Sequence, residues 1–313
     1  MSDYYAFSSI DTAIDRTKSL LWPFKKGIWL RIALISLFTG GFFSFNPFTT
    51  GTENFPFQAT TGANTFMDHL PVILAIVAAI IIFALIIAYI SSVFQFLFVD
   101  CLSSKEFAIR KYFKSNLGRG ARLFGFQIAM GVILVLIIIA AVVSLFAGVV
   151  TELSFTSLTA IIMFFLALFL ICIPFMIIML FTIDFVVPIM LKDKCGVIDG
   201  WKRCWTIMKS GWGQTIVYLI MRVILAVIVS ILMLIAIMIA AVVLAIPFFV
   251  IALFTIGFSS EFFATSALIT LLIIFIICLI PVALLISVPF VTFIRYYSLN
   301  TLGCMDENYR MTE

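Results

Sequence analysis

Two oppositely charged residues lie within apolar stretches of this sequence, and they are the residues best placed to do chemistry. Asp184 lies eight residues before Lys192, and Arg222 lies ten residues after Trp212. At 1.5 Å per helical residue, both lie about 10–15 Å inside the boundaries that Lys192 and Trp212 mark. An unpaired charge in hydrocarbon costs about 2.5–3.5 kcal/mol even on insertion scales. We therefore predict that Asp184 and Arg222 form an ion pair.

Two glutamines occupy the equivalent positions earlier in the chain. A shift of 89 residues superposes Gln95-Phe96 on Asp184-Phe185, and a shift of 95 residues superposes Gln127 on Arg222. Amide groups, like an acid and a base, can hydrogen bond between adjacent helices. Two interpretations remain open for these four residues: a clasp that orients the helices, or polar groups on a transport path.

Few other residues of the sequence are suited to metal binding or catalysis. The chain has one histidine, His69, and six cysteines with no C-x-x-C spacing, so a zinc or iron site lacks ligands. No nucleophile and base stand together in a known pattern, and no glycine-rich phosphate loop occurs. We expect no catalytic residue, no cofactor and no metal site, and therefore no enzyme.

The elements that hold the polar residues follow from composition. Hydrophobic residues make up 64% of the chain and charged residues 11%, and the mean hydropathy is +1.27. A soluble core could not hide that much apolar surface. Each of six charge-free intervals reaches the roughly 20 residues that a bilayer crossing needs. We predict an all-α integral membrane protein with six transmembrane helices, at 32–52, 70–99, 123–151, 153–183, 223–260 and 262–294.

The distribution of charge orients these crossings. All nineteen Lys and Arg residues lie on one side of the six-span arrangement, against eleven acids, for a charge of +8; the other side holds four acids, for −4. Pro174 could split the fourth interval into a hairpin, but that would place Lys192 and Lys194 outside. The positive-inside rule therefore predicts a multi-pass protein of the cell membrane with cytoplasmic N- and C-termini. Anionic headgroups are the expected partners and nucleic acid is not.

An internal repeat organises the chain. Ala13-Ile14-Asp15 aligns without gaps with Val197-Ile198-Asp199, and a weaker copy opens at Ala108-Ile109. We predict one membrane domain, 1–313, of three units at about 9–100, 103–192 and 194–297, with a short tail at 298–313. Each unit comprises a cytoplasmic amphipathic helix followed by two crossings.

The three amphipathic helices have recognisable signals. The second opens with a capping-box pattern at Ser103–Glu106 and closes near Asn116 and Gly118, and Gly211 suits the C′ position of the third. The apolar faces are Ile10, Ile14, Thr17 and Leu21 in the first, and Val197, Trp201, Cys204, Trp205 and Met208 in the third.

Tryptophans and bases on these helices indicate a position in the inner interface of the membrane. A docking surface for a cytoplasmic protein or an anionic lipid is the alternative. The interface residues are Trp22, Trp29, Trp201, Trp205, Trp212, Lys202 and Arg203.

Two segments resemble known families. The stretch Asp11–Arg31, DTAIDRTKSLLWPFKKGIWLR, with Gly40-Gly41 and Asn46-Pro47-Phe48, resembles the start of an archaeal multi-pass membrane family of unknown function. Asp184–Gly213 resembles the membrane domain fused to some glycerophosphodiester phosphodiesterases. The resemblance implies a six-helix bundle. The soluble barrel that carries the phosphodiesterase chemistry is absent here, so no catalytic residue is carried over.

Three function classes remain, and the residues rank them. We expect a membrane scaffold or accessory protein acting at the cytoplasmic leaflet, because the polar residues suffice for architecture. The alternative is a transporter or channel for a lipid or small solute that uses the Asp184/Arg222 region. A membrane-embedded enzyme ranks last. The outer segment 46–67 is a loop or a lid on either view.

Overall fold

The computed structural model describes residues 5–39, 63–104, 108–151, 156–258 and 261–311, and all regular elements in these ranges are helices. Five of these helices are long and apolar enough to cross a membrane. The predicted first crossing, 32–52, is described only to residue 39, and its remainder lies outside the described residues. The elements are α1 (Tyr5–Leu21), α2 (Lys26–Thr39), α3 (Ala63–Ser104), α4 (Ile109–Thr151), α5 (Thr156–Phe181), the π-helical turn η1 (Thr182–Val186), α6 (Val187–Asp193), α7 (Val197–Ser210), α8 (Trp212–Phe258), α9 (Glu261–Met305) and the 3₁₀ turn η2 (Glu307–Tyr309).

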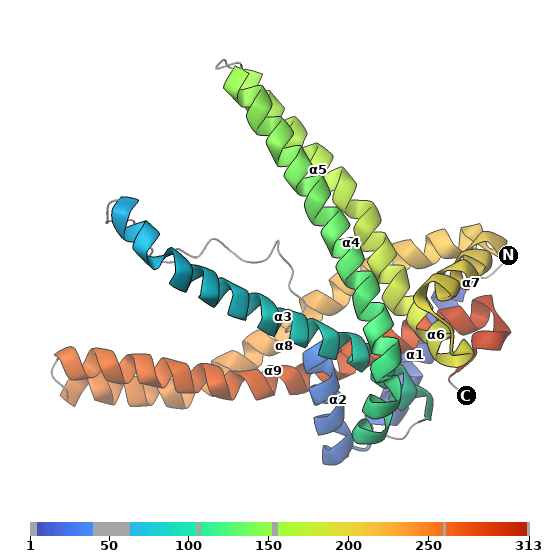
Figure 1. Cartoon of the computed structure of the whole chain (residues 1–313). Helices are drawn as coiled ribbons and strands as arrows, with labels where there is room; N and C mark the ends of the chain where they lie inside the picture. Colours follow the sequence, from blue (N-terminus) through green and yellow to red (C-terminus); the bar gives the residue numbers. More distant parts are fainter. Residues whose placement is uncertain (1–4, 40–62, 105–107, 152–155, 259–260, 312–313) are drawn as a thin grey trace.

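The long helices diverge from a common base (Figure 1). Helices α4 and α5 form one hairpin and α8 and α9 a second, while α3 packs on α4 near the base and then separates from it. We call these projecting parts the arms. The base comprises α1, α2, α6, α7 and the adjoining ends of the long helices. Within the described residues the arms splay apart and do not pack together as one bundle.

Burial separates the arms from the base. Arm residues such as Phe83 and Phe249 are each 64% exposed, as expected of helices that are apolar all round and contact lipid. The buried side chains gather in the base, where Phe96, Phe185 and Tyr297 are fully enclosed. The base is therefore the part of the molecule that tertiary packing holds together.

Helix α1 confirms the first amphipathic helix, but its buried face is rotated from the predicted one. Ile14 is 49% exposed, whereas the small residues Ala6, Ser9 and Ala13 are buried together with Thr17 and Leu21. The reason is that α1 packs along α9, and small side chains let two helix backbones approach closely.

The predicted second amphipathic helix is wrong as a separate element. Helix α4 runs without a break through Asn116 and Gly118, and Ser103 and Ser104 belong to the end of α3 rather than to a helix start. Gly118 and Gly120 do not end the helix because a glycine inside a helix costs only about 1 kcal/mol relative to alanine. A Cβ on Gly120 would overlap Val93 of α3, so this glycine permits the close α3–α4 contact.

The third amphipathic helix is α7, and it packs through a glycine. Its buried residues are Val197, Gly200, Cys204 and Met208. A Cβ on Gly200 would lie 2.9 Å from Val186 Cγ1 and 3.0 Å from Met190 Cγ, so only glycine allows this approach to η1 and α6.

Two details of α7 differ from the sequence prediction. Trp205, predicted on the apolar face, is 51% exposed, because the close contact at Gly200 rotates the buried face away from it. Gly211 caps the helix with a φ of −136°, so it does not adopt the left-handed C′ conformation. Burial raises the pKa of the Cys204 thiol to about 12.

Three further predictions concern where helices end, and they can be compared with the structure. Pro174 lies inside α5, and α5, η1 and α6 follow one another without interruption, so no hairpin forms there. Helix α9 extends to Met305, so the predicted tail 298–313 begins inside a helix. Of the predicted outer loop 46–67, residues from Ala63 onward belong to α3 and the rest lie outside the described residues.

Candidate functional site

A π-helical turn sets up the candidate site. In η1 the backbone N–H of Val187 bonds to the carbonyl of Thr182, five residues back. The carbonyl of Ile183 would bond to residue 188 in the same register, but Pro188 has no N–H. The turn therefore leaves that carbonyl for a partner on another helix and projects Asp184 from the helix. Such π turns occur frequently at functional sites.

Four side chains form what we call the ionic cluster: Asp184, Tyr218, Arg222 and Arg295. Arg222 Nε donates to Oδ2 of Asp184 at 2.8 Å, so the predicted ion pair forms. The Tyr218 hydroxyl donates to the same oxygen at 2.9 Å, and Arg295 Nη1 lies 3.8 Å from Oδ1. Asp184 is 2% exposed, so the carboxylate is neutralised by groups from α8 and α9 rather than by water.

Arg295 is the residue that the sequence analysis missed. Its Nη1 donates to the carbonyl of Ile183 at 2.7 Å, and its Nη2 lies 3.4 Å from the carbonyl of Gln95. The arginine thereby joins α9 to η1 and α3. Its side chain is 5% exposed, so it lies inside the protein and not on a solvated basic surface. A signal was available: Arg295 is the one charged residue in 262–305 of the sequence.

Aromatic rings close the cluster on the side of the base. Tyr218 stacks on Tyr297 with 5.7 Å between ring centroids and 13° between the planes, and Phe185 lies 4.7 Å from Tyr218. Trp201 Nε1 donates to the Thr182 hydroxyl at 3.2 Å, which joins α7 to η1. These contacts exclude water, and ionic interactions are stronger where water is excluded.

The two glutamines do not repeat the geometry of the acid and base. Gln127 accepts a hydrogen bond from Ser92 at 2.7 Å, across the α3–α4 contact. Gln95 is buried and borders the ionic cluster, one turn after Ser92 on α3. Because α3 contacts α4 on one side and α6 on another, the glutamines meet different neighbours.

A cavity of about 340 Å³ adjoins the ionic cluster. One end is polar, and the walls that extend along α8 and α9 are mainly apolar. The polar lining comprises Asp184, Arg222, Arg295, Gln95, Thr39 and Ser230; the apolar lining comprises Phe98, Ile183, Ala226, Val229, Met233, Phe290, Val291 and Ile294.

The C-terminal segment docks on the base through Tyr309. Its hydroxyl donates to Asp193 Oδ2 at 2.6 Å, and Arg203 pairs with the same oxygen. Burial, with the hydrogen bond to Asp193, raises the pKa of Tyr309 to about 12. The hydrogen bonds to Tyr309 and Asp193 raise the pKa of Arg203. Arg203 thus holds the chain end, whereas the predicted interface residue Lys202 is exposed and pairs with Asp199.

The predicted interface tryptophans divide into two groups. Trp22, Trp205 and Trp212 are 74%, 51% and 49% exposed, as an interfacial position requires. Trp29 is half-buried and donates to the carbonyl of Leu21, and Trp201 points to η1 as described. Trp29 and Trp201 are therefore packing residues, because their indole N–H groups find partners within the protein.

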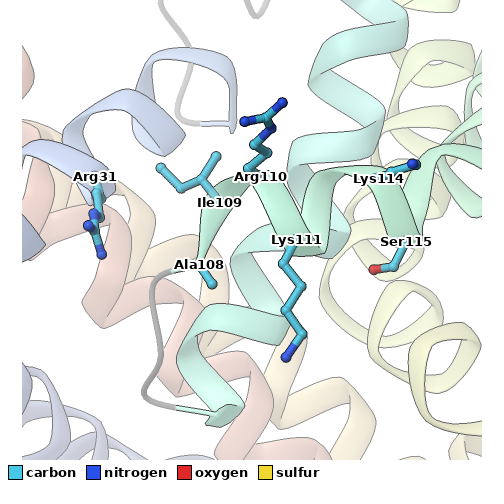
Figure 2. A pocket seen from close by; sticks show the side chains of 7 residues that line it. All are labelled: Arg31, Ala108, Ile109, Arg110, Lys111, Lys114 and Ser115. Atoms are coloured by element: carbon cyan, nitrogen blue, oxygen red, sulfur yellow. The ribbon is translucent and has the colours of Figure 1, made fainter.

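A basic cleft lies where α2 meets the start of α4. It has a volume of about 1150 Å³ and is lined by Arg31 from α2 and by residues 108–111, 114 and 115. Figure 2 shows Arg110 and Lys111 extending in opposite directions, with Arg31 on one side of them and Lys114 on the other. The cations therefore form a broad positive surface and do not converge on one point.

These observations define a polytopic α-helical membrane protein with a buried ionic cluster. The chain belongs to a family of unknown function, DUF7544, which matches residues 4–312. No curated protein and no solved structure matches the chain. Within the part of the chain that the structure describes, no group of three or more His, Cys, Asp or Glu residues could hold a metal ion.

Proposed function

We propose that the protein is a non-catalytic membrane scaffold or accessory subunit whose base lies at the cytoplasmic leaflet. The observation that carries this proposal is the state of Asp184. Asp184 is 2% exposed, its carboxylate accepts hydrogen bonds from Tyr218 and Arg222 of α8, and a second cation, Arg295 of α9, lies nearby. A buried acid with this many partners acts as a helix clasp, whereas a group that takes up a transported ion must be reachable.

We also propose how the chain is threaded through the membrane. Six crossings in three units place both termini in the cytoplasm of a cell-membrane protein. The segregation of bases supports this orientation, and so does the position of both chain ends near the base (Figure 1). We also propose that the chain is related to an archaeal membrane family and, more distantly, to the membrane domain fused to some glycerophosphodiester phosphodiesterases.

Anionic lipids are the proposed environment of the base. The basic cleft presents Arg31, Arg110, Lys111 and Lys114 without a carboxylate in its described lining. Each base near an anionic surface contributes about 1 kcal/mol. The divergent side chains in Figure 2 suit many headgroups better than one specific headgroup.

Purification in native-lipid nanodiscs followed by native mass spectrometry tests the scaffold role. We expect a protein subunit to be retained by the wild type and lost when the exposed pair Trp205 and Trp212 is changed to serine. A matched control, Phe83→Ala on an arm, should retain it. A chain that retains no protein under these conditions contradicts the scaffold role.

One observation favours transport as a second candidate: the cavity beside the ionic cluster has both polar and apolar walls. Proteoliposomes test it by measuring proton and solute flux. If the protein transports, Asp184→Asn abolishes flux while Gln127→Ala, at the α3–α4 contact outside this cavity, preserves it. Flux that is the same with and without protein excludes the transporter.

A further inference from the structure

We propose that the cavity beside the ionic cluster binds a phosphate group carried on a lipid. This inference concerns what occupies the cavity, and it holds for a scaffold or for a transporter.

The lining of the cavity carries more positive than negative charge. The described ionisable side chains that line the cavity are one carboxylate, Asp184, and two guanidinium groups, Arg222 and Arg295. Asp184 neutralises one positive charge, so a formal charge of +1 remains on this group, in which Asp184 and Arg295 are buried. One carboxylate shared by two guanidinium groups neutralises them incompletely, and an anion in the cavity would supply the missing negative charge.

Arg295 has a hydrogen-bond donor that the described protein does not use. Arg295 uses Nη1 on the carbonyl of Ile183, and its Nη2 lies near the carbonyl of Gln95. Its Nε is buried and has no hydrogen-bond partner within the described protein. Buried N–H groups are nearly always paired, so an orphaned one at a cavity indicates a missing acceptor. A phosphate oxygen is such an acceptor, and the guanidinium fork suits it.

The lining of the cavity is polar at one end and apolar along its walls. Arg222, Ala226, Val229 and Met233 follow each other on one face of α8, so the cavity changes from charged to apolar along that helix. Phe290 and Val291 of α9 form an apolar wall. A free inorganic anion would leave these walls uncovered, whereas a lipid places its phosphate at the arginines and its chain along the walls.

Binding to the purified full chain in dodecyl maltoside micelles tests the proposal, with dioctanoyl phosphatidylglycerol as the probe. We expect saturable calorimetric binding. Dioctanoyl phosphatidylcholine, in which a choline cation offsets the phosphate, should bind about tenfold more weakly. Equal binding of the two lipids would overturn the proposal. Inorganic phosphate tests the source: weak competition supports a lipid, and competition at equal affinity overturns the lipid and leaves a free anion.

Two variants locate the site. Ala226→Phe fills the cavity without changing a charge and should weaken phosphatidylglycerol binding about tenfold. Lys111→Gln removes a cation from the basic cleft and should change binding by less than about twofold. Unchanged binding by Ala226→Phe places the lipid elsewhere and overturns the proposal. Asp184→Asn adds net positive charge and should tighten binding, which a merely disrupted fold would not do.

Discussion

At the scale of single residues, two energies determine what the ionic cluster does: the gain from each hydrogen bond and the cost of leaving a charge without a partner. A hydrogen bond between membrane helices contributes on average about 0.6 kcal/mol, whereas a charge left without a partner in the membrane costs about 2.5–3.5 kcal/mol. The cluster therefore stabilises the fold less through the strength of each contact than through the penalty for breaking one. Asp184 is the member whose loss leaves most charge unpaired, because two arginines depend on it.

Removing Asp184 should be more costly than removing its neutral partner. We expect Asp184→Ala to lower the free energy of unfolding by about 3–5 kcal/mol, because both arginines remain buried without a counterion. Tyr218→Phe removes one hydrogen bond and should cost about 1 kcal/mol. Denaturant unfolding in mixed micelles measures both. Lys202→Ala, at an exposed pair, should change stability by less than about 1 kcal/mol, and equal losses in all three variants would contradict this ranking.

We expect the phenol of Tyr309 to lose its proton at a higher pH than an ordinary tyrosine does. Its pKa in the folded protein is about 12 against an ordinary 10.0, so the neutral phenol is the form that the fold favours. Its contribution to docking the C-terminal segment is therefore complete below pH 10 and is lost as the pH rises through about 12. The difference in absorbance at 295 nm between wild type and Tyr309→Phe reports this group. A midpoint near the ordinary value would show that the tyrosine is not docked.

At the scale of elements, glycines determine how the helices of the base approach. Gly200 lets α7 lie against η1 and α6, and Gly120 lets α4 lie against α3. Amphipathic patterns locate the helices, but they rank large apolar residues as the buried ones. In α1 and α7 the buried face instead includes the small residues Ala13 and Gly200, because backbone proximity adds more packing contact than one large side chain.

Two neighbouring glycines of α4 should respond oppositely to alanine. At Gly118 a Cβ meets nothing within 4 Å, so Gly118→Ala should stabilise by up to about 1 kcal/mol through helix propensity. At Gly120 a Cβ would lie 3.0 Å from the Val93 backbone, so Gly120→Ala should destabilise by about 1–3 kcal/mol. Thermal unfolding in detergent compares the pair. Stabilisation by both substitutions would mean that α3 and α4 are not in close contact.

At the scale of the whole molecule, charge and apolar surface divide the protein into two regions. The arms expose apolar side chains along their length, and the base holds the amphipathic helices and the exposed tryptophans. Lipid can cover the arms, while the base offers cations to the headgroups. This division gives the orientation proposal a direct test.

Cysteine labelling should report the base as cytoplasmic. In intact cells, with the native cysteines changed to serine, Lys111→Cys and Lys202→Cys should resist a membrane-impermeant maleimide until the cells are opened. Glu261→Cys should react at once, because the proposed orientation places this residue on the other side of the membrane. Reaction of Lys202→Cys from outside would invert the orientation, and reaction of all three would contradict a single inner side.

The class of protein and one contact of the candidate site were predictable from the sequence. Apolar intervals of about 20 residues or more locate membrane helices, because the cost of placing a charge in lipid depends on local composition. The same cost predicted that Asp184 and Arg222 must meet. Pro188, four residues after Asp184, is a local signal for the π turn, although its consequence depends on a distant residue.

Tertiary structure alone decided the remainder. Arg295 contacts a carbonyl 112 positions away, and Tyr218 reaches Asp184 across 34 positions. Local composition does not predict such pairs. It indicates which side chains avoid lipid, but not which residue each of them contacts. Contacts between residues remote in the sequence also determine the continuity of α4, the rotated face of α1 and the inward position of Trp201. Each depends on how closely a second helix approaches, and that distance is set by side chains remote in the sequence.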